Sequence, residues 1–329
     1  MSPSTKRVAA IDCGTNSIRL LVADLALDGS SLTDVDRRLE IVRLGQGVDE
    51  TRRLAPEALD RTFRACRTYG ELIERAGATA TRFVATSASR DAENRDEFVA
   101  GVRDILGVSP EVVSGSEEAT LTFAGGTRDT VPAGAATPYL AVDIGGGSTE
   151  FVLGDPVAAE RPRQISVDLG SVRLTERVLL SDPPTAAEVA EATAEVDARI
   201  DEAEAVIPLR ETGTFVGLAG TVTTVAAMVL DLPAYQPEKI HRSVIEAGAI
   251  ARTTERLLSM TAAERAALPF MHPGRADVIG AGALILDRIV RRVADRSDGR
   301  TGWVSGSAES ALLVSEHDIL DGIAWSLLT

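Results

Sequence analysis

A chain of 329 residues is long enough to form two domains and to bury a substantial core. Its 49 acidic residues outnumber its 34 basic residues, and the net charge of −15 argues against a general nucleic-acid-binding surface. Aromatic residues make up only 4% of the chain, which argues against base stacking or a carbohydrate platform as the main mode of recognition. Any polyanionic ligand must be held by local groups, because the field of the whole molecule repels it.

The cysteine content and the apolar runs indicate the compartment. Cys13 and Cys66 are the only cysteines in the sequence. Two cysteines are too few for a disulfide framework, and their spacing does not match that of a zinc site. The first residues lead into a strand without a signal-peptide core, and no apolar run reaches membrane-spanning length. We therefore expect two buried thiols, no membrane contact and a cytoplasmic location.

The first predicted element is a hairpin over residues 8–24. An apolar strand ends at Asp12, a short polar turn follows, and a second apolar strand begins. The turn contains a glycine, so a ligand can approach its backbone closely. Successive free N–H groups in such a turn form a site for anions. The turn residues are Gly14, Thr15, Asn16 and Ser17.

The next segments alternate between strands and helices. We predict a strand over 39–47 that runs into a glycine loop, then a helix that begins at Pro56 and stops at Gly77. A strand over 82–88 leads toward a helix that carries Phe98. Arg90 lies between them, where ligand-binding groups of open α/β sheets are common. It is equally compatible with a surface arginine that pairs with nearby carboxylates.

Two adjacent glutamates begin the following helix. A short strand over 111–113 precedes Ser114, which has capping-box spacing to Glu117. Glutamates in the first turn of a helix are commonly surface carboxylates favoured by the helix dipole. The alternative is that one of them turns inward and orients a water molecule. The stretch 125–138 is rich in Gly, Ala, Thr and Pro, so we place the domain boundary there.

The stretch 139–155 repeats the first hairpin. Shifted by 131 positions (143 minus 12), the two copies align without a gap. Asp12 matches Asp143, and both copies read as strand, Asp-x-Gly, polar turn and strand. This repeat predicts two related α/β lobes, each offering a hairpin loop to one cleft. Carboxylates do not contact phosphate directly with ease, so Asp143 and Glu150 predict a divalent cation beside the glycine turn.

The remaining segments add two further candidate ligand groups. A strand and turn over 163–173 and a long acidic helix ending near 207 come first. Gly220 and Thr221 then lie between a strand and a helix, which suits an oxyanion or phosphate, although tight packing explains them equally well. Arg275 precedes a helix over 278–293. We expect a last strand and turn at 303–306 and a closing helix over 319–328. Neither a GxxxxGK[ST] loop nor a GxSxG elbow occurs.

Together these motifs resemble the exopolyphosphatase / guanosine pentaphosphate phosphatase family, in the form of a short two-domain actinobacterial-type member. The resemblance implies an α/β fold of two duplicated ribonuclease H-like lobes of the actin-like, sugar-kinase ATPase superfamily, with an interlobe cleft. It places the N-terminal lobe at 1–128, with the Glu118 helix at its end, and the C-terminal lobe at 129–329. The last helix is expected to pack back on the first lobe. The motifs that carry it are 12–19, 86–90, 114–119, 143–150, 219–221 and 273–277.

The resemblance also implies a role for individual residues. Glu118 matches the catalytic carboxylate that positions and partly deprotonates the attacking water. Asp143 and Glu150, together with Asp12, match the positions that hold the cofactor, Mg²⁺ or Mn²⁺. The predicted phosphate-binding residues are Gly14, Thr15, Asn16, Ser17, Arg19, Arg90, Gly145, Gly146, Gly147, Ser148, Thr149, Gly220, Thr221 and Arg275.

The implied activity is an exopolyphosphatase that releases orthophosphate from the end of inorganic polyphosphate. Because the chain ends soon after the second lobe, we expect short polyphosphate chains as the substrate. Guanosine pentaphosphate (pppGpp) 5′-phosphohydrolase is the alternative within the same chemistry. A small-molecule kinase or ATPase, or a non-catalytic sensor of (p)ppGpp or polyphosphate, are alternatives of other classes. A homodimer is the implied assembly.

Overall fold

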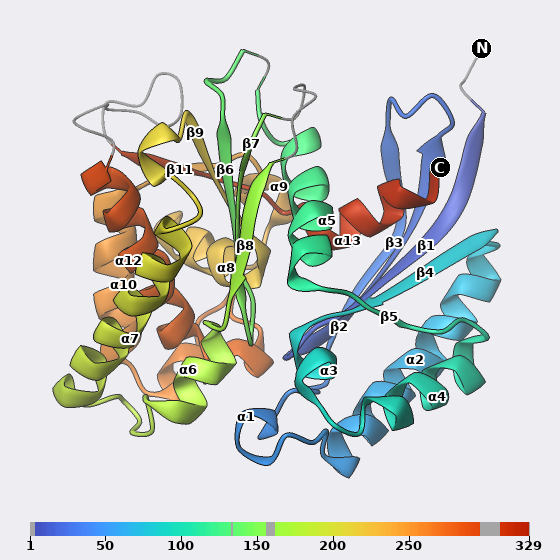
Figure 1. Cartoon of the computed structure of the whole chain (residues 1–329), viewed down its shortest axis with the longest axis horizontal. Helices are drawn as coiled ribbons and strands as arrows, with labels where there is room; N and C mark the ends of the chain where they lie inside the picture. The colour runs from blue at the N-terminus through green and yellow to red at the C-terminus, as the bar shows by residue number, and fades with distance from the viewer. Residues whose placement is uncertain (1–3, 133, 156–161, 297–309, 329) are drawn as a thin grey trace. The chain divides into compact units, whose positions relative to one another are not determined.

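The computed structural model describes residues 4–132, 134–155, 162–296 and 310–328. The chain forms two compact units, one of Met1–Gly125 with Ile319–Thr329 and one of Gly126–Asp318 (Figure 1). The division falls within one helix, and the closing segment belongs to the first unit. The domain limits expected from the sequence, 1–128 and 129–329, remain a prediction.

The first unit is built on a five-stranded sheet with the order β3-β2-β1-β4-β5. Strands β1, β2 and β3 are successive antiparallel neighbours, whereas β4 runs parallel to β1 and β5 runs parallel to β4. The strands are β1 (Thr5–Cys13), β2 (Ser17–Ala26), β3 (Leu32–Ile41), β4 (Ala80–Ala85) and β5 (Glu111–Val112). The helices are α1 (Val48–Thr51), α2 (Pro56–Ala76), α3 (Ser87–Asp91), α4 (Arg95–Leu106), α5 (Gly115–Arg128), α13 (Ile319–Trp325) and the 3₁₀ turn η3 (Ser326–Leu328).

Helices cover both faces of this first sheet. On one face, α2 and α4 lie side by side and bury Tyr69 and Phe98 against the strands (Figure 1). On the other face, α13 packs against β1, β2 and β4, and Leu121 of α5 joins the same apolar cluster. Arg37 of β3 anchors α13 through an ion pair of 2.6 Å with the buried carboxylate of Asp321. The end of the chain thus completes the core of the first unit.

The second unit is built on a six-stranded sheet with the order β10-β11-β9-β6-β7-β8. Its strands are β6 (Tyr139–Ile144), β7 (Thr149–Gly154), β8 (Arg163–Val167), β9 (Thr214–Leu218), β10 (Val244–Glu246) and β11 (Ala311–Val314). Its helices are α6 (Ser171–Arg177), α7 (Ala186–Glu204), α8 (Ala219–Val229), α9 (Pro237–Ile240), α10 (Ala247–Ser259), α11 (Ala262–Ala266) and α12 (Ile279–Arg296), with the 3₁₀ turns η1 (Leu209–Glu211) and η2 (Pro273–Arg275).

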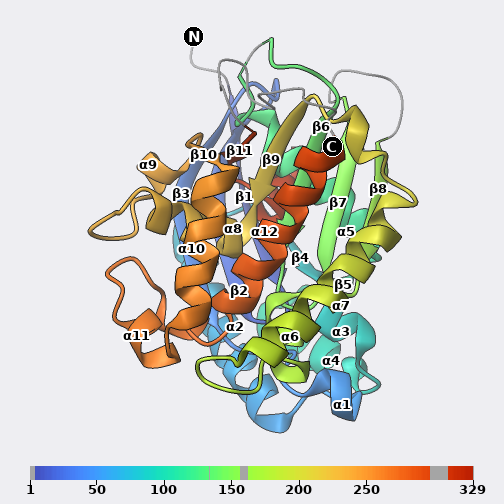
Figure 2. The same ribbon diagram turned by 90° about the vertical axis from the view of Figure 1, so that its left-hand side faces the viewer.

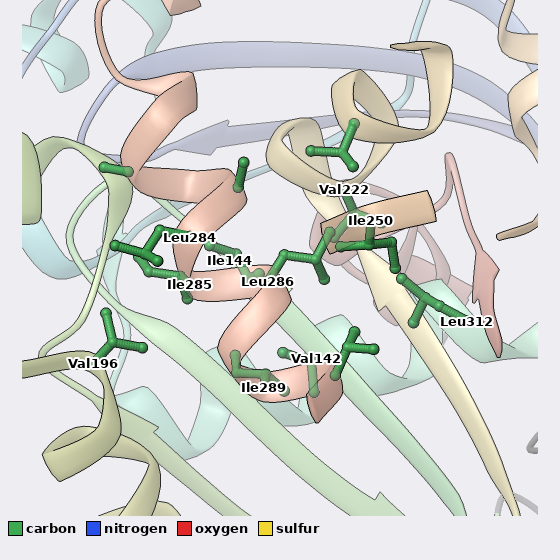
Figure 3. Close-up of a cluster of buried hydrophobic side chains, with 14 of the residues drawn as sticks. Val142, Ile144, Val196, Val222, Ile250, Leu284, Ile285, Leu286, Ile289 and Leu312 are labelled. Carbon is green, nitrogen blue, oxygen red and sulfur yellow. The ribbon is translucent and has the colours of Figure 1, made fainter. Parts of the chain in front are cut away.

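The central helix of the second unit is α12. It packs against α6, α7, α8 and α10, and Figure 2 shows α10 and α12 side by side in front of the sheet. Its apolar side chains meet those of β6, α7, α8, α10 and β11 (Figure 3). The residues labelled there are Val142, Ile144, Val196, Val222, Ile250, Leu284, Ile285, Leu286, Ile289 and Leu312.

The two sheets repeat one topology, which confirms the predicted fold class of two related α/β lobes. Reading β3-β2-β1-β4-β5 in the first unit and β8-β7-β6-β9-β11 in the second gives the same order. The strand directions also match, since β6 and β7 are antiparallel, β7 and β8 are antiparallel, and β9 runs parallel to β6 and β11. Strand β10 is an addition at the edge of the second sheet.

Several predicted boundaries differ from the structure. The strand predicted over 39–47 begins at Leu32 and ends at Ile41. The strand predicted over 82–88 stops at Ala85, because Ser87 already begins α3. The strand and turn predicted at 303–306 lie outside the described residues. Within the described part of the chain, none of the helices has the length and apolar character needed to cross a membrane.

Candidate functional site

The hairpin turn of the first unit is held from one side by the segment that follows β3. The N–H of Gly14 donates to Ser17 O at 2.9 Å and closes the turn. The carbonyl of Asn16 accepts the N–H groups of residues 42 and 43 at 3.1 and 2.8 Å, and Thr15 O accepts the N–H of Gly45 at 2.9 Å. Gly45 has to lack a side chain here, because a Cβ would lie 2.3 Å from Thr15 Cγ2. The carbonyls of Thr15 and Asn16 therefore face this supporting segment.

The hairpin turn of the second unit is held in the same way by the start of α6. Gly145 N–H donates to Ser148 O at 3.0 Å, as its counterpart does in the first unit. Two N–H groups from the first turn of α6 donate to Gly146 O at 2.9 and 3.1 Å. Arg173 Nε donates to Gly147 O at 2.8 Å. The sequence prediction missed Arg173, although it stands at a helix start, as Arg275 does.

The opposite side of this second turn carries unused donors. Within the described ranges, the N–H groups of Gly146 and Gly147 donate to no backbone or side-chain acceptor. Because the carbonyls are turned toward α6, these N–H groups form the type of nest that binds an oxyanion. Thr149 is fully buried, and its hydroxyl donates to Leu169 O at 2.6 Å, so its side chain is engaged within the second unit. Its role in phosphate binding remains a prediction.

The two hairpins carry different charges at equivalent positions. Asp143 and Glu150 are direct partners in the β6–β7 register, and both are buried. Partners in a register point to the same face of the sheet, so two carboxylates lie together there. In the first unit the equivalent partners are Asp12 and Arg19, which form an ion pair of 2.6 Å. The first pair therefore joins an acidic and a basic side chain, whereas the second joins two acidic side chains.

This difference favours the second hairpin as the place for a cation. Hard divalent cations such as Mg²⁺ take one or two carboxylates and keep several water ligands. Asp143 and Glu150 fit that donor set, and Ser166 Oγ donates to Glu150 Oε1 at 2.7 Å and orients it. Asp12 fits it less well, because Arg19 already neutralises it. Among the residues described, no group of three or more His, Cys, Asp or Glu side chains forms a complete protein-made metal cage.

The structure separates the two adjacent glutamates of α5. Glu117 is half exposed and pairs with Arg82 at 2.8 Å on the outside. Glu118 is 7% exposed and turns inward, where Arg90 Nη1 lies 3.0 Å from its Oε2. Arg90 also donates to Val113 O at 3.1 Å, which fixes the guanidinium in place. Of the two carboxylates, Glu118 is therefore the one that turns inward, as one of the two sequence-based alternatives expected.

A hydroxyl pair joins the first hairpin to the helix that carries Arg90. Thr15 Oγ1 and Ser87 Oγ are 2.9 Å apart, and Ser87 is the first residue of α3. Thr15 thus contacts the start of α3, and the same short helix carries Arg90, which contacts Glu118. The functional roles of these three residues remain predictions. Ser87 was not among the predicted site residues. Its position became apparent only from the parallel pairing of β1 with β4, which aligns the ends of the two strands.

The second unit also brings the predicted residues Gly220 and Arg275 into contact. Arg275 ends the short turn η2, in which His272 Nδ1 accepts the N–H of Gly274 at 3.2 Å. Burial, and then the positive charge of Arg275, lower the pKa of His272. Thr221 is buried and packs against Gly282 of α12. Its role in phosphate binding remains a prediction.

The two cysteines are buried and free. Burial, followed by the charges of Cys66 and Asp12, raises the pKa of the Cys13 thiol well above its ordinary value. Burial also raises the pKa of Cys66 to about 12. Neither thiol is set up as a nucleophile, because nucleophilic cysteines need a lowered pKa.

Two α/β units with duplicated glycine-containing hairpins, the first unit also carrying an inward glutamate, define a class of two-lobed proteins. Residues 22–302 match the Ppx/GppA phosphatase family, and the chain belongs to this family. Exopolyphosphatase 2 of Mycobacterium tuberculosis is 48% identical over 328 residues, which cover 98% of each chain.

Solved structures of similar proteins share the whole fold. An exopolyphosphatase-like protein superposes with a TM-score of 0.91 at 41% identity, over 98% of both chains. An exopolyphosphatase from Cytophaga hutchinsonii superposes with a TM-score of 0.83 at 25% identity, again over 98% of both chains. The similarity therefore covers both units.

Proposed function

We propose that this protein is an exopolyphosphatase that hydrolyses the terminal phosphoanhydride of inorganic polyphosphate and releases orthophosphate. The observation that carries the proposal is the inward, buried Glu118 held by Arg90, in a chain that is 48% identical to a relative named Exopolyphosphatase 2. A general base must lie within reach of the proton it takes, and its orientation has to be fixed. Glu118 meets the second condition through Arg90.

The proposed reaction is phosphoryl transfer to water. The water oxygen attacks the terminal phosphorus, its proton passes to the Glu118 carboxylate, and the bond from phosphorus to the bridging oxygen breaks. Catalysis of this type depends on positioning and on electrostatic stabilisation more than on covalent chemistry. The sequence-based prediction that both hairpins act on one substrate remains a prediction.

Phosphate binding would rely on local donors in an acidic protein. The open N–H groups of Gly146 and Gly147 and the guanidinium of Arg275 are the donors that we assign to phosphate oxygens. Each charge-assisted contact is worth about 1.5–3 kcal/mol, so a few of them offset the repulsion from the net charge of −15. Arg19 has a smaller share in this proposal, because it neutralises Asp12.

Asp143 and Glu150 would hold the Mg²⁺ or Mn²⁺ ion. The bound cation would neutralise charge on the phosphate oxygens. Replacing Glu150 by Gln is expected to raise the Mg²⁺ concentration for half-maximal activity by roughly tenfold or more, because a ligating charge is lost. Titrating activity with Mg²⁺ after treatment with EDTA measures this change.

The matched control for the Glu150 variant is Glu117→Gln. Glu117 is half exposed and paired with Arg82, so its loss should leave the Mg²⁺ dependence unchanged. An unchanged Mg²⁺ dependence in Glu150→Gln would reject the assignment. If Asp12→Asn alone changed the Mg²⁺ dependence, the cation site would be assigned to the first hairpin instead.

Phosphate release from a graded set of substrates tests the proposed function. The protein is incubated with Mg²⁺ and with polyphosphates of defined length, pppGpp, ATP or GTP. We expect the fastest release from polyphosphate, with short chains preferred. Phosphate release from pppGpp alone would make pppGpp the substrate. Transfer of label from ATP to a small acceptor would favour a kinase. No phosphate release from any of these compounds would reject an exopolyphosphatase and favour a non-catalytic sensor. The homodimer and the cytoplasmic location remain predictions.

A further inference from the structure

The first turn of α8 lies directly against the guanidinium of Arg275. A Cβ atom at position 220 would lie 2.4 Å from both Cζ and Nη2 of Arg275 and 2.9 Å from its Nε. Three atoms of the planar group are thus close to one point, so the guanidinium lies across Gly220. Only glycine leaves this space open.

The hydrogen bonds from this guanidinium to α8 are long. Arg275 Nη1 is 3.5 Å from Gly220 O and 3.4 Å from Thr224 Oγ1, both at the long end for hydrogen bonds. The Thr224 hydroxyl donates to Gly220 O at 2.6 Å, and its oxygen is the acceptor that faces Arg275. The close packing on Gly220 is a separate contact: the guanidinium can lie this near to the start of α8 only because residue 220 has no side chain.

The start of α8 and the guanidinium of Arg275 are two positive groups that lie close together. The N-terminus of a helix carries a partial positive charge, so a cation placed there is repelled. Arg275 nevertheless lies at the start of α8, where Ala219 also adopts a left-handed backbone conformation with φ 66°. An anion bound beside Arg275 would interact favourably with both the arginine and the helix terminus.

We propose that Gly220 is a positioning residue, whose missing side chain lets the guanidinium of Arg275 occupy the place from which it binds a phosphate group of the substrate. The inference rests on the proposed function and assigns Gly220 a role that acts through Arg275. It differs from the sequence-based prediction that Gly220 itself binds phosphate.

The geometry makes Gly220→Ala a selective probe. The three closest atoms all belong to the end of a long, flexible side chain, and Gly220 has no positive φ that alanine would avoid. The added methyl group should therefore displace Arg275 and leave the backbone in place. We expect the KM for polyphosphate to rise about tenfold, as for loss of one charge-assisted contact, with a smaller change in kcat and an unchanged Tm.

A double-mutant cycle with Arg275→Ala decides between the two roles. If Gly220 acts through Arg275, the double variant should have the same KM as Arg275→Ala alone. Gly248→Ala is the control, since Gly248 is also in a helix of the second unit and its Cβ would meet only Arg252 Nη1, at 3.4 Å. This control should leave KM unchanged. A double variant whose KM rises by the product of the two single effects would overturn the inference. An unchanged KM in Gly220→Ala would overturn it as well.

Calorimetric titration with inorganic tripolyphosphate in the presence of EDTA and without Mg²⁺ repeats the cycle without turnover. A wild-type protein that binds tripolyphosphate but releases no phosphate would reject the proposed function, while the binding cycle would still decide the role of Gly220. Equal behaviour of the wild type and Gly220→Ala in this titration, including no binding by either, would overturn the positioning role.

Discussion

Replacing Glu118 by Gln is expected to lower kcat for polyphosphate hydrolysis by about 100-fold or more, with little change in KM. Gln has nearly the same shape and can still accept a hydrogen bond from Arg90, which lies 3.0 Å from the carboxylate. It cannot take a proton from water, so the loss should fall on the chemical step. Initial rates over a range of substrate concentrations separate the two constants.

The neighbouring carboxylate provides the control. Glu117→Gln changes the same residue type on the same helical turn, but Glu117 faces outward and pairs with Arg82. Its kcat should stay within about twofold of the wild type, since a surface ion pair contributes little. Equal damage in both variants, or near-normal turnover in Glu118→Gln, would remove Glu118 from its role as the base.

Gly322→Ala is expected to lower the free energy of unfolding by about 3 kcal/mol, the upper part of the range for overpacked sites. A Cβ at position 322 would lie 2.0 Å from Leu121 O and 2.7 Å from Leu121 C, and both are backbone atoms of α5. Helix α13 is confined between α5 and the first sheet, so neither side can move easily. Thermal unfolding should shift down by roughly 6–12 °C.

Gly70→Ala is the matched control for this change. Gly70 also lies inside a helix of the first unit, but a Cβ there would meet only a side-chain end, Leu106 Cδ2, at 3.1 Å. That side chain can adjust, and alanine is the better helix former, so stability should change by less than about 1 kcal/mol. Equal stability of Gly322→Ala and the wild type would mean that α13 approaches α5 less closely than described.

Local signals in the sequence predicted the parts of the fold that depend on neighbouring residues. Helix α2 begins at Pro56 and ends before Gly77, as predicted, because proline suits the first turn and Gly77 takes the left-handed conformation that ends the helix. The gap-free repeat predicted both hairpins, and the matching strand orders confirm the two related lobes.

Contacts between distant segments could not be predicted in this way. The sequence left open which glutamate turns inward, because the answer depends on Arg82 from β4 and Arg90 from α3. The segments that support the two hairpin turns follow β3 and β8, and no local pattern marks them. The contact between Gly220 and Arg275 likewise joins two distant elements, the start of α8 and the 3₁₀ turn η2.

The charge difference between the hairpins was present in the sequence but acquires meaning only with the register. The shift of 131 positions (143 minus 12) also places Arg19 on Glu150 (150 minus 131 is 19). The structure shows that each of these residues faces the aspartate of its own hairpin across the same pair of strands. The repeat therefore predicts one cation site, in the second hairpin. In the first hairpin, the positive charge of Arg19 takes the place of that cation.

Phosphorus-31 NMR of a polyphosphate digestion tests the central claim most directly, because it distinguishes terminal from internal phosphate groups. An exopolyphosphatase removes one end group and exposes another, so orthophosphate should rise and internal groups should fall while the terminal signal stays constant until chains become short. The same reaction with Glu118→Gln should show almost no orthophosphate. A rising terminal signal, which marks internal cleavage, or no orthophosphate from the wild-type protein would contradict the account.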